Sequence, residues 1–222
     1  MTAKPPLLPL FLGAETCLYI AFLYCDLTGR WAAGTALKYA AILLCLLLSL
    51  DNRSRKDGRL VSLALALTAL ADLFLLVLNQ NYALGVALFC PVQLIYALRL
   101  RRAAGRPAPL WPCLLFSGGA LAALAFTGSL TVLSGLVCLY FPQLVCNAAE
   151  SLALPPGLQN RLFSAGLWLF LCCDICVGLH NLLPLLPGSF PAFAAFAQIA
   201  MWAFYLPSQV LIVLSASRRF PL

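Results

Sequence analysis

The sequence predicts an all-α, polytopic membrane protein, a bundle of eight transmembrane helices. Of its 222 residues, 63% are hydrophobic and only 9% are charged, whereas soluble domains have roughly 45–50% and about 25%. The apolar runs also reach the roughly 17–25 residues of a membrane helix and exceed the roughly 9–11 of a barrel strand. Together these observations exclude a soluble enzyme, a nucleic-acid-binding module, a disordered tail and a secreted disulfide scaffold.

Polar or Pro/Gly-rich breaks divide the chain into eight apolar spans. We expect the helices to be Pro6–Cys25, Trp31–Leu50, Leu60–Leu78, Tyr82–Leu98, Leu110–Phe126, Leu130–Ala149, Leu162–Leu183 and Pro191–Ala216. The breaks include Asp51–Arg59, Asn79–Asn81, Arg99–Pro109, Thr127–Ser129, Ser151–Arg161 and Pro184–Phe190. The first span has no convincing cleavage site and is predicted to be a helix rather than a removed signal. No room is left for a soluble domain, so residues 1–222 are expected to form a single integral membrane domain.

The positions of the charges support this count. With a cytoplasmic N-terminus, almost all basic residues fall on the inner side, where positive charge is retained. The inner set is Lys4, Arg53, Arg55, Lys56, Arg59, Arg99, Arg101, Arg102, Arg106, Arg161, Arg218 and Arg219, and the outer set is at most Arg30 and Lys38. The sequence therefore predicts a cell-membrane protein with both termini cytoplasmic. The net charge of +7 is explained by basic loops, and no nucleic-acid partner is expected.

The ten cysteines are not expected to bind a metal. Most lie inside apolar runs, where cysteine behaves as a small hydrophobic residue. Cys173 and Cys176 have C-x-x-C spacing, but zinc needs further ligands and His180 is the only histidine. We expect neither a metal nor another cofactor.

Ionisable residues inside membrane spans are candidates for function because burying a charge in lipid is costly. Asp72 and Asp174 lie at similar depth in the third and seventh spans, and Lys38 reaches the same level from the second. We expect these three residues to share an internal cavity in which the two aspartates are catalytic. Glu15 is expected to form a structural salt bridge with Lys38.

Further polar residues recur at helical spacing. Asp72 and Asn79 are seven residues apart, as are Asp174 and Asn181, and such pairs share a helix face. The candidate substrate-binding residues are Lys38, Asn79, Gln93, Tyr96, Tyr140, Gln143, Asn147, Tyr205 and Gln209. The alternative for each is a hydrogen bond that joins two helices and does nothing else.

A faint internal repeat accompanies these residues. Asp72, Asn79 and Gln93 in the first half correspond to Asp174, Asn181 and Gln209 in the second. Such a correspondence suggests two related four-helix halves with a site between them, although the spacing differs between the copies.

Four short motifs carry a family resemblance. They are Ala71-Asp72-Leu73; Tyr82, Gly85, Phe89, Gln93 and Tyr96; Gly166, Phe170, Cys173 and Asp174; and Tyr205, Ser208 and Gln209. With Lys38 and Tyr140, they make the chain resemble, over almost its whole length, the YhhN-like lysoplasmalogenases, eight-helix membrane proteins. The chain departs from the family pattern at four positions, where Ala71, Gln93, Cys173 and Tyr39 replace Gly, His, Ser and Pro.

The resemblance implies an activity. Family members cleave the vinyl-ether bond of lysoplasmalogens, releasing a fatty aldehyde and a glycerophospho-alcohol. The expected substrate is thus a lysophospholipid from the bilayer, and the other partners are membrane lipids. Asp72 and Asp174 would divide acid and base roles, one protonating the vinyl ether and the other orienting water, as glycosidase carboxylates do.

Two other functions compete with this one. A proton-coupled transporter of a small or lipid-like substrate would use the same aspartates to load and unload protons. A catalytically inactive lipid-binding protein is favoured by the departures at Gln93 and Cys173. A closed lipid-sized cavity with both carboxylates at its end would favour the enzyme, access from both sides would favour the carrier, and a packed core with no cavity would favour the inactive protein. The oligomeric state and the head group of the substrate have no sequence signal.

Overall fold

The computed structural model describes residues 7–51, 56–106, 109–183 and 190–217. Those residues form an all-α bundle, as predicted. The helices are α1 (Leu7–Leu27), α2 (Trp31–Asp51), α3 (Lys56–Asp72) with a π-helical turn η1 (Leu73–Val77), α4 (Tyr82–Ala104), α5 (Trp111–Phe126), α6 (Val132–Ser151), α7 (Leu158–Leu182) and α8 (Pro191–Ser215). Within the described residues, seven helices are long and apolar enough to cross a membrane. The other, α5, has 16 residues and spans about 24 Å.

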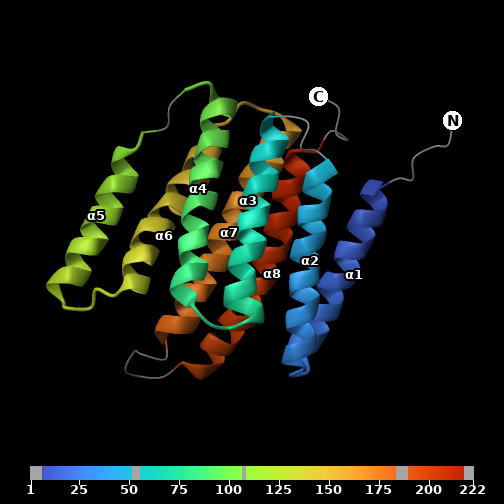
Figure 1. Cartoon of the computed structure of the whole chain (residues 1–222), viewed down its shortest axis with the longest axis horizontal. Helices are drawn as coiled ribbons and strands as arrows, with labels where there is room; N and C mark the ends of the chain where they lie inside the picture. The colour runs from blue at the N-terminus through green and yellow to red at the C-terminus, as the bar shows by residue number, and fades with distance from the viewer. Residues whose placement is uncertain (1–6, 52–55, 107–108, 184–189, 218–222) are drawn as a thin grey trace.

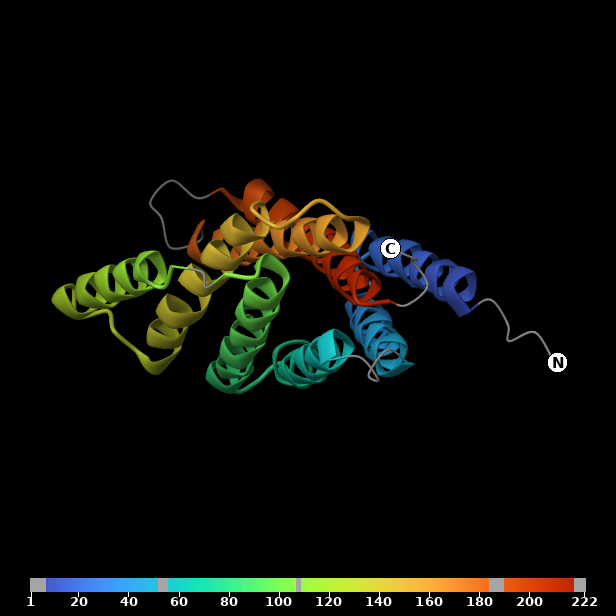
Figure 2. The same ribbon diagram turned by 90° about the horizontal axis from the view of Figure 1, so that it is seen from above.

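The helices run alternately up and down, so α1 begins and α8 ends at the same end of the bundle (Figure 1). Seen from above, α4, α3 and α2 form one row and α7, α8 and α1 form the other (Figure 2). The α6 helix joins the rows by contacting both α4 and α7, while α3 contacts α8 between the rows. The α5 helix packs against α6 at the edge of the bundle. This arrangement makes α3, α4, α6, α7 and α8 the elements that can enclose an internal site.

Local chemistry explains several helix boundaries. The α4 helix stops at Gly105, whose φ of 65° is a left-handed conformation that glycine adopts without steric cost. The α6 helix begins with a capping box in which the Thr131 side chain accepts a hydrogen bond from the Ser134 amide and the Ser134 side chain accepts one from the Thr131 amide. Pro91, Pro142 and Pro207 lie inside α4, α6 and α8 without ending them.

The arginine-rich segment after the fourth span is helical, which corrects the expectation of a basic loop over Arg99–Pro109. The α4 helix continues to Ala104 and includes Arg99, Arg101 and Arg102. Arg99 is 5% exposed, because its guanidinium bonds both oxygens of Asp57 and the side chain and carbonyl of Ser215. These bonds compensate the charge, so the helix need not end where the arginines begin.

The third helix also differs from its predicted span. It begins at Lys56 rather than Leu60, and its last turn, Leu73–Val77, is π-helical. Asn79 and Asn81 then adopt positive φ values of 50° and 56°, so the chain reverses sharply into α4. The predictions for Lys4, Pro6, Arg53, Arg55, Pro184, Arg218 and Arg219 lie outside the described residues.

The core is aromatic and aliphatic, and many large apolar side chains face outward. Tyr96, Phe22, Phe163 and Phe170 are among the largest fully buried side chains. Exposed leucines and phenylalanines occur along the outer faces, with Phe126 reaching 95%. An outer surface of this kind fits a lipid environment.

Candidate functional site

Asp72 is held at the junction of α3 and η1. Its side chain is buried, with 4% of its surface exposed, and its Oδ2 accepts a 2.8 Å hydrogen bond from the Tyr205 hydroxyl of α8. The π-helical turn begins at the next residue. Short π-helical turns inside α-helices occur frequently at functional sites because they redirect side chains.

Asp174 has a matching tyrosine. It lies on α7, is half-buried, and accepts a hydrogen bond from the Tyr140 hydroxyl of α6. The rings of Phe170 and Phe89 link the two tyrosines, since Phe170 contacts Tyr205, Phe89 contacts Tyr140, and the two phenylalanines contact each other. Two aspartate–tyrosine pairs from four helices thus lie in one neighbourhood.

Aromatic rings surround these pairs. Phe170 lies between the two tyrosine systems, with ring centroids 5.5 Å from Tyr205 and 5.7 Å from Phe89. Phe89 in turn lies 5.6 Å from the Tyr140 ring. The two tyrosines that partner the aspartates are therefore joined through the buried rings of Phe89 and Phe170.

A second group of polar side chains lies one helical turn from the aspartates. It lies toward the end of the bundle where α4 carries Arg99, Arg101 and Arg102, which we call the basic end. Gln93 is fully buried, and its backbone carbonyl and Oε1 each accept a 2.9 Å hydrogen bond from the Asn147 amide. Gln209 is four residues beyond Tyr205 and is fully buried. Among the described residues, the amide of Gln209 and the hydroxyls of Tyr96 and Thr68 have no hydrogen-bond partner.

Such unpartnered buried groups are rare in native proteins and mark places where water or a ligand is bound. The layer of Gln93, Tyr96, Asn147, Gln209 and Thr68 thus provides polar contacts directly next to the aspartates. Thr68 had not been predicted, although its position four residues before Asp72 places it on the same helix face.

The sequence model of the YhhN family matches residues 33–216, most of the 222 residues. The chain belongs to the YhhN family. No curated protein and no solved structure matches it. Both aspartates and both of their tyrosine partners fall inside the segment matched by the YhhN family.

Lys38 of this YhhN protein has a different partner from the predicted Glu15. Lys38 pairs with Asp26 at 2.7 Å, and both side chains are buried. The expected bridge to Glu15 is wrong, because the Glu15 Oε1 instead accepts a 3.3 Å hydrogen bond from Cys45. The Lys38 Nζ lies 4.9 Å from the centroid of Trp202, whose ring contacts Tyr205. Lys38 is therefore linked to the site through an aromatic ring and supports the position of Tyr205.

Two other predicted residues lie apart from the aspartates or make no contact with them. Asn79 is exposed in the turn after η1 and accepts a 2.6 Å hydrogen bond from Tyr82. The prediction that Asn79 and Asp72 share a helix face is wrong. The π-helical turn changes the rotation per residue, and the helix ends before Asn79. Gln143 is half-buried on α6, four positions before Asn147, the residue that bonds Gln93.

Two residues missed by the sequence reasoning help to build the site. Asp26 falls between the first two predicted spans, yet it is 4% exposed and neutralises Lys38. Trp202 had no distinguishing sequence signal, because a tryptophan in an apolar span is indistinguishable from an ordinary packing residue. A buried lysine needs a carboxylate, and that requirement is the signal that could have identified Asp26.

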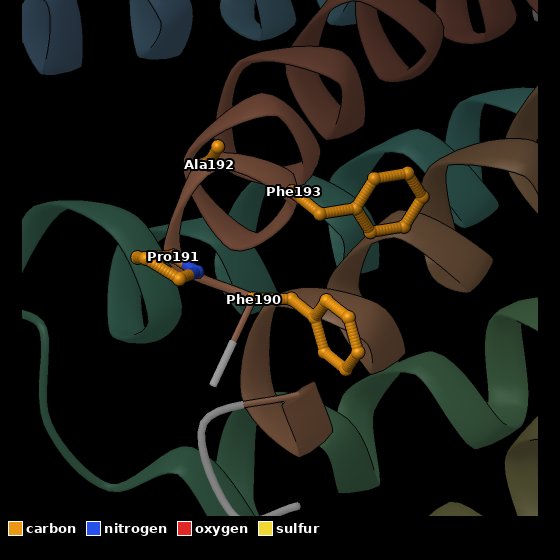
Figure 3. A pocket seen from close by; sticks show the side chains of 4 residues that line it. All are labelled: Phe190, Pro191, Ala192 and Phe193. Atoms are coloured by element: carbon orange, nitrogen blue, oxygen red, sulfur yellow. The ribbon is translucent and has the colours of Figure 1, made fainter. Parts of the chain in front are cut away.

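Elsewhere in the described structure there is neither a cluster of metal ligands nor a titratable group in the lining of the pocket at the start of α8. No three His, Cys, Asp or Glu side chains of the described residues gather as metal ligands. A shallow pocket of about 460 Å³ opens at the start of α8, where Phe190 and Phe193 present their rings beside Pro191 and Ala192 (Figure 3). It has no titratable side chain in its lining, so its chemistry is limited to apolar contact.

Proposed function

We propose that this protein is a lysoplasmalogenase-type hydrolase of the membrane, cleaving the vinyl-ether bond of lysoplasmalogens. The observation that carries the proposal is the presence of two aspartates, Asp72 and Asp174, each hydrogen-bonded to its own tyrosine inside an apolar bundle. Membership of the YhhN family supports the same reaction class.

The proposed reaction needs one carboxylic acid and one carboxylate. The acid transfers its proton to the β-carbon of the vinyl ether, and the electron pair of the double bond forms the new C–H bond, leaving an oxocarbenium ion. Water attacks the cationic α-carbon and gives a proton to the carboxylate. The resulting hemiacetal transfers its hydroxyl proton to the ether oxygen, and the C–O bond breaks to give the aldehyde and the alcohol. One water is consumed, and proton return between the aspartates restores the site.

The surroundings of the aspartates suit this sequence of steps. Tyr205 and Tyr140 orient the carboxyl groups, and the buried rings of Phe89 and Phe170 make the surroundings of these tyrosines apolar. The polar layer beside them, with Gln209, Tyr96 and Thr68, offers unpartnered donors and acceptors for the attacking water and the head group. This division of roles parallels the carboxylate pair of glycosidases.

A catalytically inactive lipid-binding protein is the second candidate. Its support is Gln93, which replaces the histidine of the family pattern and bonds Asn147 across α4 and α6. That contact is a structural link rather than a proton relay. The transporter has less support, because transporter sites are typically formed by interrupted helices, whereas the proline-containing helices α4, α6 and α8 continue past Pro91, Pro142 and Pro207.

The test is incubation of the purified protein with a lysoplasmalogen and with the matching ester lysophospholipid, assaying aldehyde and fatty acid. We expect aldehyde from the vinyl ether and no fatty acid from the ester. Asp72→Asn and Asp174→Asn should each abolish aldehyde release. Glu150→Gln is the matched control, because Glu150 lies at the basic end, 3.9 Å from Arg106, and should leave activity unchanged. Full activity in either aspartate variant would refute the proposal.

A further inference from the structure

A pocket of about 300 Å³ opens at the basic end of the bundle, away from the aspartates. It is formed where α3 begins, α4 ends and α7 begins. Its polar lining comes from Lys56 and Asp57, from Arg99 and Arg102, and from Gln159 and Asn160. Three helices therefore contribute polar side chains to one small concave site.

The pocket carries more positive charge than the carboxylates of the described residues pair with. Both carboxylate oxygens of Asp57 accept hydrogen bonds from the Arg99 guanidinium, at 2.8 Å and 3.0 Å. The same guanidinium also bonds Ser215 and lies 4.0 Å from the Phe163 ring centroid, which fixes it in place. Lys56 and Arg102 make no ion pair with any carboxylate of the described residues, so two positive charges remain.

Neutral donors complete the lining. The Gln159 Nε2 is buried and has no partner among the described residues. The first intrahelical bond of α7 runs from the Arg161 amide to the Gly157 carbonyl, so the amides of residues 158–160 precede the helical ladder. Free amides at a helix N-terminus attract anions, and here they adjoin two uncompensated cations.

This pocket is separate from the site of the aspartates. Lys56 and Asp72 are the first and last residues of the 17-residue helix α3, so about 24 Å separates them along the axis. Only a few bonds of a glycerol backbone separate the phosphate of a lysophospholipid from its vinyl ether. A single substrate molecule with its vinyl ether at the aspartates therefore cannot place its phosphate in this pocket.

We propose that the pocket between Lys56, Arg102 and Gln159 binds a phosphate group, either the head group of an anionic lipid in the adjoining leaflet or free phosphate. The two cations and the helix amides provide charge, and the Gln159 amide adds a directed hydrogen bond. The position of the pocket at the end of three predicted membrane-spanning helices would place it at the level of lipid head groups, so that a head group could enter while its acyl chains remain in lipid. Binding there joins α3, α4 and α7 and requires no catalysis.

The test is native mass spectrometry of the full-length protein titrated with phosphatidylglycerol and, separately, with inorganic phosphate. Lys56→Gln/Arg102→Gln should weaken binding about 30-fold, because each basic group contributes roughly fivefold. Gln159→Leu should also weaken it while keeping the net charge. The matched control, Arg106→Gln/Arg161→Gln, removes two charges from the same end outside the pocket and should retain binding.

Each outcome decides the proposal. Binding of phosphatidylglycerol alone supports a lipid head group, and binding of inorganic phosphate as well supports a site for the phosphate itself. The proposal would be overturned if the pocket double variant and the control double variant lost binding affinity equally. It would also be overturned if both Gln159→Leu and the pocket double variant bound as tightly as the parent protein. The readout is independent of aldehyde release, so failure here and failure of the proposed hydrolase activity are distinguishable.

Discussion

At the scale of single residues, the proposed site depends on which side chains contact each other. Tyr205 and Asp72 are 133 positions apart in sequence yet share a 2.8 Å hydrogen bond. The sequence identified both as polar residues in apolar spans, because such residues are costly in lipid. It could not identify them as partners, since that depends on how each helix is rotated.

Replacing Tyr205 by Phe removes the donor to a buried carboxyl group. We expect the variant to be destabilised by about 1–3 kcal/mol, because Asp72 loses its hydrogen bond without gaining water. Thermal unfolding in detergent measures this. Tyr82→Phe is the control, since Tyr82 bonds Asn79 in an exposed turn and water replaces the lost bond. Equal destabilisation of both variants would contradict the assignment of Asp72 as buried and bonded.

The Lys38–Asp26 pair gives a second prediction at this scale. Lys38→Met leaves the Asp26 carboxylate buried without its cation, and we expect a loss of about 3–5 kcal/mol in unfolding free energy. The double variant Lys38→Met/Asp26→Leu removes both charges and should recover most of that loss. Denaturation curves of the single and double variants provide the comparison. A single variant as stable as the parent protein would show that the pair is not buried.

The mistaken Lys38–Glu15 bridge shows where reasoning from spans fails. Both residues lie inside apolar runs and carry opposite charges, but neither property shows that their side chains meet. Depth fixes the position along a helix axis but not the direction in which the side chain points. Asp26, at the end of the first helix, is the residue that Lys38 reaches.

At the scale of helices, apolar length predicted where the elements lie, and most boundaries agree within a few residues. The exceptions have physical causes. Arg99 remains helical because Asp57 and Ser215 compensate its charge. The π-helical turn Leu73–Val77 has the same apolar composition as the α-helix before it, so it has no sequence signal, and its changed rotation removed Asn79 from the expected face.

Two glycines of α7 provide a matched test of helix packing. A Cβ at Gly166 would lie 2.7 Å from the Ile212 Cγ1 and 3.1 Å from the Ser208 carbonyl oxygen, whereas Gly178 has nothing within 4 Å. We expect Gly166→Ala to destabilise the protein by about 1–3 kcal/mol through overpacking of α7 against α8. Gly178→Ala should be neutral or stabilising by up to about 1 kcal/mol from helix propensity. Thermal unfolding compares them, and the reverse order would contradict the close contact of these helices.

At the scale of the whole molecule, the alternation of eight helices places the start of α1 and the end of α8 together (Figure 1). Arg99, Arg101 and Arg102 lie at that same end, in the last turns of α4. Retention of positive charge in the cytoplasm predicts that this end of the bundle faces the cytoplasm. The bundle as a whole was predictable because composition and span length act on every helix alike, whereas the site depends on a few individual contacts.

This orientation predicts the behaviour of reporter fusions. Green fluorescent protein fused after Leu222 should fluoresce in bacterial cells, because it folds in the cytoplasm. Alkaline phosphatase at the same position should be inactive, because it needs the periplasm to form its disulfides. An active phosphatase and a dark fluorescent protein would place the C-terminus outside and reverse the sidedness of the pocket at the basic end.

The most direct test of the account measures aldehyde release from lysoplasmalogen by Tyr140→Phe, Tyr205→Phe and the double variant. Each tyrosine contacts a different aspartate, so each single change should slow turnover about 10- to 100-fold. If both carboxyls act on one vinyl ether, the double variant should lose less than the product of the two single losses. Losses that multiply as if independent, or no loss from either change, would contradict a shared site.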